Sequence, residues 1–237
     1  MFKRFFFVTV FMIAAGMLLQ SFAGQTIRIE GSDVSISDFT TLNVDVPFDV
    51  YFTQDAVVSA KVEGLDNIAQ TIEFQQKGKE LTLKLKEKGG HYGKVKVFLS
   101  APSLENVNVT KSGSFYTLNQ IVNSKSFHAA IAGSGNVDID ANAPKVEIGI
   151  AGSGNAKLKG SSKRVDVDIA GSGDCRGKDM LADEVSVDIA GSGNAYVFAN
   201  DTVDVDIAGS GSVYYSGDPE HVTTDIAGSG NVGPDKL

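Results

Sequence analysis

Ile169-Ala170-Gly171-Ser172-Gly173 is one copy of the stretch that decides the fold. The same five letters begin at Ile131, Ile150, Ile189, Ile207 and Ile226, and successive starts lie 19, 19, 20, 18 and 19 residues apart. A period near 20 residues is typical of a repeat architecture in which each unit stacks on its neighbours. The six copies therefore predict an elongated, stacked fold.

Each repeat has the pattern of a strand, a tight glycine turn and a second strand. Residues 165–169 alternate apolar and acidic side chains, as a strand with one buried face does. Gly171 and Gly173 can adopt φ > 0 without steric cost, so the chain can turn between the strands. We therefore predict an all-β protein, a β-solenoid with rungs of about 19 residues.

Two columns of residues are expected to point into the core. The repeat isoleucines form the first, and each would contribute roughly 1.5–3 kcal/mol when fully buried. The second column is the small apolar residue two positions after each turn: Val137, Ala156, Cys175, Ala195, Val213 and Val232. Cys175, the single cysteine, is therefore expected to be a buried structural thiol, and no intramolecular disulfide can form.

Residues 1–23 have the pattern of a signal peptide. Lys3 and Arg4 precede an apolar run over 5–19, and Ser21-Phe22-Ala23 fits a small-x-small cleavage site. The run is shorter than the roughly 20 residues of a membrane span. We expect the mature chain to start at Gly24, to contain no transmembrane segment, and to be exported to the periplasm, the outer-membrane surface or the medium.

The composition is acidic, with a net charge of −8 that becomes −10 once Lys3 and Arg4 are removed. Nucleic acid is disfavoured as a partner because phosphate binding needs clustered Lys and Arg. The three histidines, His91, His128 and His221, share no spacing with the cysteine, so no zinc or catalytic cluster is visible. No cofactor is predicted, apart from the Ca²⁺ considered below.

Residues 24–104 carry strand patterns without the glycine punctuation, and we expect strands at 41–46, 47–52, 56–63, 81–86 and 94–99. A short helix is expected at 65–70 and a hairpin tip at 88–93, since no helix follows those glycines to make a phosphate-binding loop. Residues 107–114 are a degenerate repeat. We predict one domain over 24–237, with 24–104 as an irregular β region that caps the rungs of 105–237.

The first half also carries a family resemblance. It rests on Phe39, Val44, Pro47-Phe48-Asp49-Val50, Val62-Glu63-Gly64, Lys94-Val95-Lys96-Val97 and Ala101-Pro102-Ser103-Leu104, ahead of tandem Gly-Ser-Gly-Asn turns. In these features the chain resembles the exported family named putative auto-transporter adhesin, or head GIN domain. The resemblance covers nearly the whole mature chain. It implies a right-handed, single-stranded β-helix, a cell-envelope location and an adhesin-like role, and it brings no catalytic residues.

Acidic residues recur at the outward positions before the turn. Asp168, Asp188, Asp206 and Asp225 directly precede repeat isoleucines, and Asp166 and Asp204 come two residues earlier. Stacked rungs would place these like charges about 4.8 Å apart, where they repel. One interpretation is a solvated face that keeps the protein soluble. The other is a divalent-cation site, with Ca²⁺ as the ion.

Tyr196 and Tyr214 follow their turns by the same offset, with Phe198 and Tyr215 beside them. We expect Tyr196 and Tyr214 to stack outward on neighbouring rungs, where aromatic side chains could bind sugar rings or a protein. The alternative is a lateral packing surface covered by residues 216–221.

These features favour a non-catalytic, exported envelope or surface protein. It would act as an adhesin-like binding or structural module for a protein or glycan that the sequence does not identify. The alternative is a polysaccharide-active β-helix enzyme or a carbohydrate-binding domain, since Asp166, Asp168, Asp188 and Asp206 could meet the carboxyl separation of roughly 5–9.5 Å that glycosidases use. A catalytic pair should be a local exception in the repeat, whereas these acids recur with it.

Overall fold

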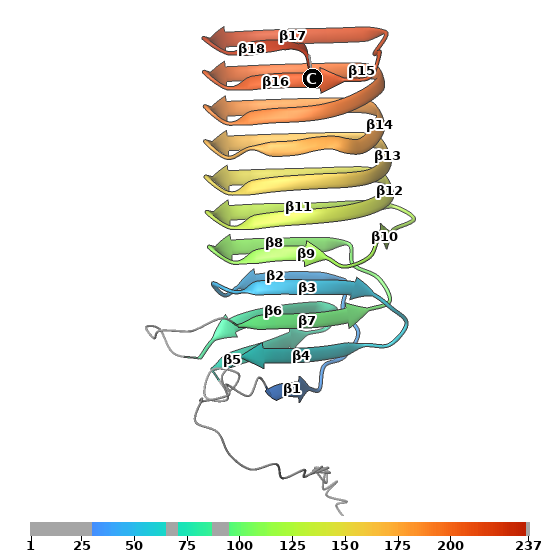
Figure 1. Cartoon of the computed structure of the whole chain (residues 1–237), viewed down its shortest axis with the longest axis vertical. Helices are drawn as coiled ribbons and strands as arrows, with labels where there is room; N and C mark the ends of the chain where they lie inside the picture. Colours follow the sequence, from blue (N-terminus) through green and yellow to red (C-terminus); the bar gives the residue numbers. More distant parts are fainter. Residues whose placement is uncertain (1–29, 65–70, 87–94, 236–237) are drawn as a thin grey trace, which may run out of the picture.

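The computed structural model describes residues 30–64, 71–86 and 95–235, and within these residues the chain forms 18 strands and no helix. The strands stack into one elongated β-solenoid (Figure 1). The expected all-β solenoid is confirmed. The expected signal peptide, the helix at 65–70 and the hairpin tip at 88–93 lie outside the described residues.

Each long repeat strand bends midway, so one rung has two legs that meet at a Gly-Ser-Gly corner on one side and at the bend on the other (Figure 1). Neighbouring rungs pair in parallel and in register, with Ile169 between Ile150 and Ile189. The strands are β11 (Ser126–Gly133), β12 (Asn136–Gly152), β13 (Asn155–Gly171), β14 (Cys175–Gly191), β15 (Asn194–Gly209), β16 (Ser212–Ser216), β17 (His221–Gly228) and β18 (Asn231–Pro234).

The first corner glycine is required by its positive φ and by a close backbone oxygen, and the second by a close backbone oxygen alone. Gly171 has a φ of 135°, and a Cβ on it would lie 2.3 Å from the Gly152 carbonyl oxygen. A Cβ on Gly173 would lie 2.1 Å from the Gly154 oxygen. The Gly152 oxygen lies close to Gly171 because it accepts hydrogen bonds from the amides of both Ser172 and Gly173, at 2.9 and 3.2 Å. Bulkier residues would therefore push adjacent rungs apart.

The polar residue after each corner adds a second link between rungs. Asn155 Nδ2 donates to Asn136 Oδ1 at 3.0 Å, and Asn194 Nδ2 donates to Asp174 Oδ1 at 3.1 Å. The structure shows side-chain hydrogen bonds from one rung to the next.

The core lies between the two legs. The isoleucines at 131, 150, 169, 189 and 207 are each at most 2% exposed, and Cys175 is fully buried. Burial, together with the charge of Asp174, raises the pKa of the Cys175 thiol to about 12, so this thiol stays protonated and unreactive. Ile226 departs from the prediction of full burial. It pairs with Ile207 but is 38% exposed, since within the described residues no later rung covers β17.

The parallel stack continues into the first half of the chain. β8 lies between β11 and β2, and β9 lies between β12 and β3, so the degenerate repeat at 107–114 is confirmed as a rung. The strands here are β1 (Glu30–Val34), β2 (Thr41–Asp45), β3 (Asp49–Gln54), β4 (Ser59–Gly64), β5 (Ile72–Lys77), β6 (Glu80–Leu85), β7 (Lys96–Ala101), β8 (Asn106–Lys111), β9 (Ser114–Thr117) and β10 (Ile121–Val122).

The pairing changes at the far end of this region. β1 pairs with β4, β4 with β7 and β5 with β6, all antiparallel. The cap role expected for residues 24–104 stays a prediction. The strand expected at 56–63 begins late, at Ser59, because the Asp55 carboxylate accepts a hydrogen bond from the Val57 amide at 2.8 Å and holds a turn there.

Because Ile169 and Ile226 differ in burial, the same Ile→Asp substitution should lower the unfolding free energy by different amounts at the two positions. Ile169→Asp should cost well over 3 kcal/mol of unfolding free energy, because it buries a charge without a partner. Ile226→Asp should cost far less, since its side chain already reaches solvent. Urea unfolding of both variants measures this difference. Equal costs would contradict the described packing.

Gly→Ala substitutions at a corner glycine and at a glycine within a strand should have different effects on stability. Gly171→Ala should destabilise the protein by more than about 1 kcal/mol, because its φ and the Gly152 oxygen both exclude a methyl group. Gly149→Ala should be neutral or stabilising by about 0.4–1 kcal/mol, because a Cβ there meets nothing within 4 Å. Thermal melts of both variants provide the test, and a stable Gly171→Ala protein would refute the corner geometry.

Candidate functional site

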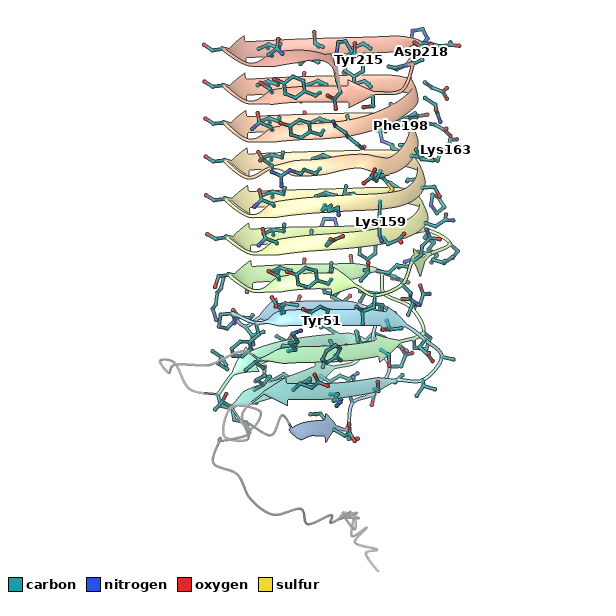
Figure 2. All side chains as sticks on the ribbon, in the orientation of Figure 1. Tyr51, Lys159, Lys163, Phe198, Tyr215 and Asp218 are labelled. Carbon is teal, nitrogen blue, oxygen red and sulfur yellow. The ribbon has the colours of Figure 1, made fainter. Side chains whose placement is uncertain are left out.

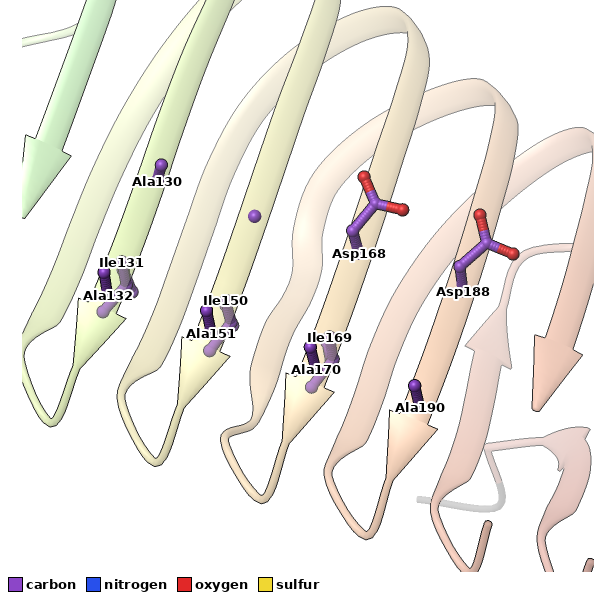
Figure 3. Close-up of a pocket in the computed structure, with 11 residues that line it drawn as sticks. Ala130, Ile131, Ala132, Ile150, Ala151, Asp168, Ile169, Ala170, Asp188 and Ala190 are labelled. Carbon is purple, nitrogen blue, oxygen red and sulfur yellow. The ribbon is translucent and has the colours of Figure 1, made fainter. Parts of the chain in front are cut away.

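Asp168, Asp188, Asp206 and Asp225 form one straight column, which we call the acid ladder. Each of these residues faces the next across a parallel strand pair. Asp168 and Asp188 point outward from successive strands, in line with Ala130 on an earlier rung (Figure 3). The predicted stacking of the four carboxylates is therefore confirmed, and the ladder begins only at Asp168.

The acid ladder is electrostatically unfavourable. Partial burial, then the charge of Asp168, raises the pKa of Asp188. Desolvation, then the charges of Asp188 and Asp204, raises the pKa of Asp206. Both shifts favour the protonated form, as expected where like charges share a strand face. The ladder therefore opposes folding when it is ionised.

The column two residues earlier behaves differently. The carboxylate of Asp166 lies 2.7 Å from the Arg164 Nε and 2.9 Å from the Lys145 Nζ. The hydrogen bond to Asp166 is the main cause that raises the pKa of Arg164. The pKa of Lys145 is raised chiefly by its hydrogen bond to Glu147 and then by its hydrogen bond to Asp166. Asp204 faces Ser186 and Thr223. Cations thus neutralise part of the acidic surface that the sequence predicts.

A shallow groove of about 420 Å³ lies beside the ladder. Small residues line most of it, including Ala132, Ala151 and Ala170, and Asp168 and Asp188 stand at its edge (Figure 3). In the described part of the chain, no three His, Cys, Asp or Glu side chains gather as a metal ion would require. Calcium binding by Asp168, Asp188, Asp206 and Asp225 stays a prediction.

Tyr196 and Tyr214 stack on the outer face of the other leg. Their ring centroids lie 5.3 Å apart with an interplanar angle of 21°, and the rings face each other across β15 and β16. Lys178 Nζ lies 5.6 Å from the Tyr196 centroid, within cation–π range. The expected outward stack is confirmed. Phe198 faces Ser216, and Tyr215 packs partly against the core.

This stack belongs to a longer column that sequence reasoning missed. The outward residue at this level of each rung, in stacking order, is Phe98, Tyr51, Tyr116, Asp138, Lys157, Arg176, Tyr196, Tyr214 and Gly233. We call it the aromatic column, because five of its nine members carry rings: Phe98, Tyr51 and Tyr116 in one group, and Tyr196 and Tyr214 in another. From Tyr116 onward, each member follows the last turn glycine by three residues, and that offset is visible in the sequence.

The lower end of the aromatic column holds three rings. Tyr51 stacks with Phe98 and with Tyr116, each at a centroid distance of 5.1 Å. Lys96 Nζ lies 5.3 Å from the Tyr51 centroid. Tyr51 lies on the N-terminal rungs, whereas Phe198 and Tyr215 lie near the C-terminal end of the solenoid (Figure 2). Ring stacks with a lysine beside them thus occur at both ends of the solenoid.

The stacked rungs and outward columns define the class of this protein as a parallel β-solenoid that presents linear surfaces of side chains. A family model described as "Putative auto-transporter adhesin, head GIN domain" matches residues 38–219, and the chain belongs to this family. No protein with a curated description matches the sequence.

Solved structures share this fold. A putative adhesin from Bacteroides fragilis is 22% identical with a TM-score of 0.82, and the alignment covers 86% of this chain and 96% of that chain. A structure from Parabacteroides distasonis, titled a putative lipid binding protein, is 26% identical with a TM-score of 0.68, covering 87% and 96%. A putative adhesin from Parabacteroides merdae is 20% identical with a TM-score of 0.70, covering 89% and 98%.

Among the described residues, no helix has the length and apolar character needed to cross a bilayer.

Asp→Asn substitutions in the two acidic columns should change the stability of the protein in opposite directions. Asp188→Asn should stabilise the protein at neutral pH, on the order of 0.2–1 kcal/mol, by removing cross-strand repulsion. Folding raises the pKa of Asp188, so ionisation of this carboxyl group destabilises the folded state. This loss of stability is absent below the ordinary pKa of 3.8 and is complete once the pH has risen through the raised value. Asp166→Asn should instead destabilise by up to about 1 kcal/mol, because it removes two ion pairs.

Urea unfolding of wild type, Asp188→Asn and Asp166→Asn across this pH range measures both effects. A destabilised Asp188→Asn protein at neutral pH would show that a favourable partner holds this carboxylate.

Proposed function

We propose that this protein is a non-catalytic, exported, adhesin-like module that binds a partner at the cell surface through its outward columns. One observation carries the proposal: the aromatic column, in which Tyr196 and Tyr214 stack on neighbouring rungs and remain partly exposed. Stacked tyrosines offer a large contact area and lose little conformational entropy on binding. Membership of an adhesin family supports an exported or surface location.

The acidic residues support binding better than catalysis. Glycoside hydrolysis needs two carboxyl groups whose environments push their pKa values apart. Asp188 and Asp206 occupy equivalent places and share the same direction of pKa shift. Asp166 is held by Arg164 and Lys145. An enzyme acting on polysaccharides is therefore the weaker alternative.

A binding assay with a matched pair of variants tests this function. The purified protein is screened against a glycan array and against envelope fractions, with and without Ca²⁺. Tyr196→Ala/Tyr214→Ala should weaken binding by about tenfold or more, as loss of aromatic contacts at an interface does. Leu181→Ala removes an equally apolar side chain, 52% exposed on β14, and should leave binding unchanged.

Two results would contradict the proposal. One is the absence of binding to any glycan or envelope fraction, and the other is hydrolysis of a glycan by the wild type. The calcium arm tests the acid ladder, because binding through a bound ion would require Ca²⁺ and would be lost in Asp188→Asn/Asp206→Asn.

A further inference from the structure

Two neighbouring steps depart from the 19-residue repeat: 20 residues from Ile169 to Ile189 and 18 from Ile189 to Ile207. β14 pairs irregularly with both of its neighbours. On the β13 side the register shifts between Lys157 and Lys159, which face Arg176 and Asp179. Two residues of β14, Gly177 and Lys178, therefore stand opposite the single residue Leu158. Such β-bulges redirect side chains and are enriched beside functional sites.

The bulge lies beside a groove of about 330 Å³ that Lys157, Arg176, Lys178, Asp179 and Tyr196 line. Three of these five residues are cations, on a chain whose net charge is −8. Two of them, Lys157 and Arg176, are members of the aromatic column. The groove thus combines positive charge and an aromatic ring where the repeat pattern breaks.

Nearby carboxylates hold two of the three cations, Lys157 and Arg176, only loosely. Lys157 Nζ lies 3.9 Å from Asp138 Oδ2, and the lysine side chain is 56% exposed. Arg176 Nη2 lies 3.3 Å from Asp174 Oδ2, and the arginine side chain is 61% exposed. That contact uses one of the five N–H groups of a guanidinium, whose planar fork suits a carboxylate.

Lys178 shows what kind of group this groove accepts. Its ammonium group pairs with the carboxylate of Asp235, which follows β18, and it also lies beside the Tyr196 ring. The chain itself therefore already brings a carboxylate to one of the three cations. A ligand carboxylate could take the same position by displacing Asp235.

The spacing of the column fits a chain of sugar rings. Successive rungs are about 4.8 Å apart, which is close to the length of one pyranose unit. A sugar chain that follows the solenoid axis would meet Lys157, Arg176 and Tyr196 on three successive rungs. Charged side chains and an aromatic wall on one axis suit a glycan with an anionic group on its rings.

We propose that this groove binds carboxylated oligosaccharides, with Arg176 and Lys157 contacting the sugar carboxylates and Tyr196 packing against a ring. This inference rests on the binding function proposed above and specifies its ligand class. Asp235 competes for Lys178 and so limits affinity.

The test is calorimetric titration of the purified protein with oligogalacturonate, alginate and hyaluronan fragments, and with neutral dextran fragments of matched length. At least one acidic glycan should bind and the neutral ones should bind much more weakly. Arg176→Gln and Lys157→Gln should each lose about tenfold or more in affinity, as expected for a charge-assisted hydrogen bond. Asp235→Asn should bind more tightly, because it frees Lys178.

Lys159→Gln is the matched control. Lys159 lies two residues from Lys157, carries the same charge, pairs with Asp140 at 3.3 Å and does not line the groove, so its loss should not change affinity. Melting curves of every variant confirm that it is folded.

Three outcomes overturn the inference. The first is binding to none of the acidic glycans, and the second is an equal loss of affinity in Lys159→Gln and Arg176→Gln. The third comes from a separate titration with phosphatidylglycerol vesicles, and it is binding of the vesicles in place of the glycans. If another glycan or envelope fraction still binds and depends on Tyr196 and Tyr214, the general binding function survives while this ligand assignment fails.

Discussion

Hydrogen bonds between the backbones of successive rungs are the interaction on which the rest of this structure depends. At the four corners from Ser153 to Ser210, two amides converge on one carbonyl of the rung before, as Ser172 and Gly173 do on Gly152. Glycine is needed there because the rungs approach too closely for a Cβ. These bonds hold the rungs in register, so each residue faces its counterpart on the next rung. Side chains at equivalent positions therefore form columns along the surface.

Different outward columns use this register in opposite ways. The acid ladder stacks like charges, and partial burial together with the neighbouring carboxylates raises the pKa values of Asp188 and Asp206. The column after the corner that holds Asp140 and Lys159 stacks opposite charges, at 3.3 Å. The fold therefore tolerates either pattern. The repulsion in the acid ladder comes from the residues placed there and is not imposed by stacking.

Repetition explains which features could be predicted. The six isoleucines share one environment, so their alternation with polar residues is enough to place them in the core, with Ile226 as the exception at the end of the described stack. The acid ladder and the Tyr196–Tyr214 stack follow from the same register. The groove at Lys157, Arg176 and Lys178 was missed because it arises from a bulge, and a 20-residue step does not say where the extra residue lies. In the first half, the antiparallel pairs of β1 with β4 and of β4 with β7 depend on contacts between distant segments, which no local pattern encodes.

The direction of the hydrogen bonds between rungs has a mechanical consequence. These bonds run along the solenoid axis, whereas the covalent backbone runs across it. Tension applied along the axis would open one interface after another, so each would carry the load in turn. Tension applied along the strands would load the bonds of an interface together in shear. The protein is therefore mechanically anisotropic, and the load it can bear depends on the direction in which that load is applied.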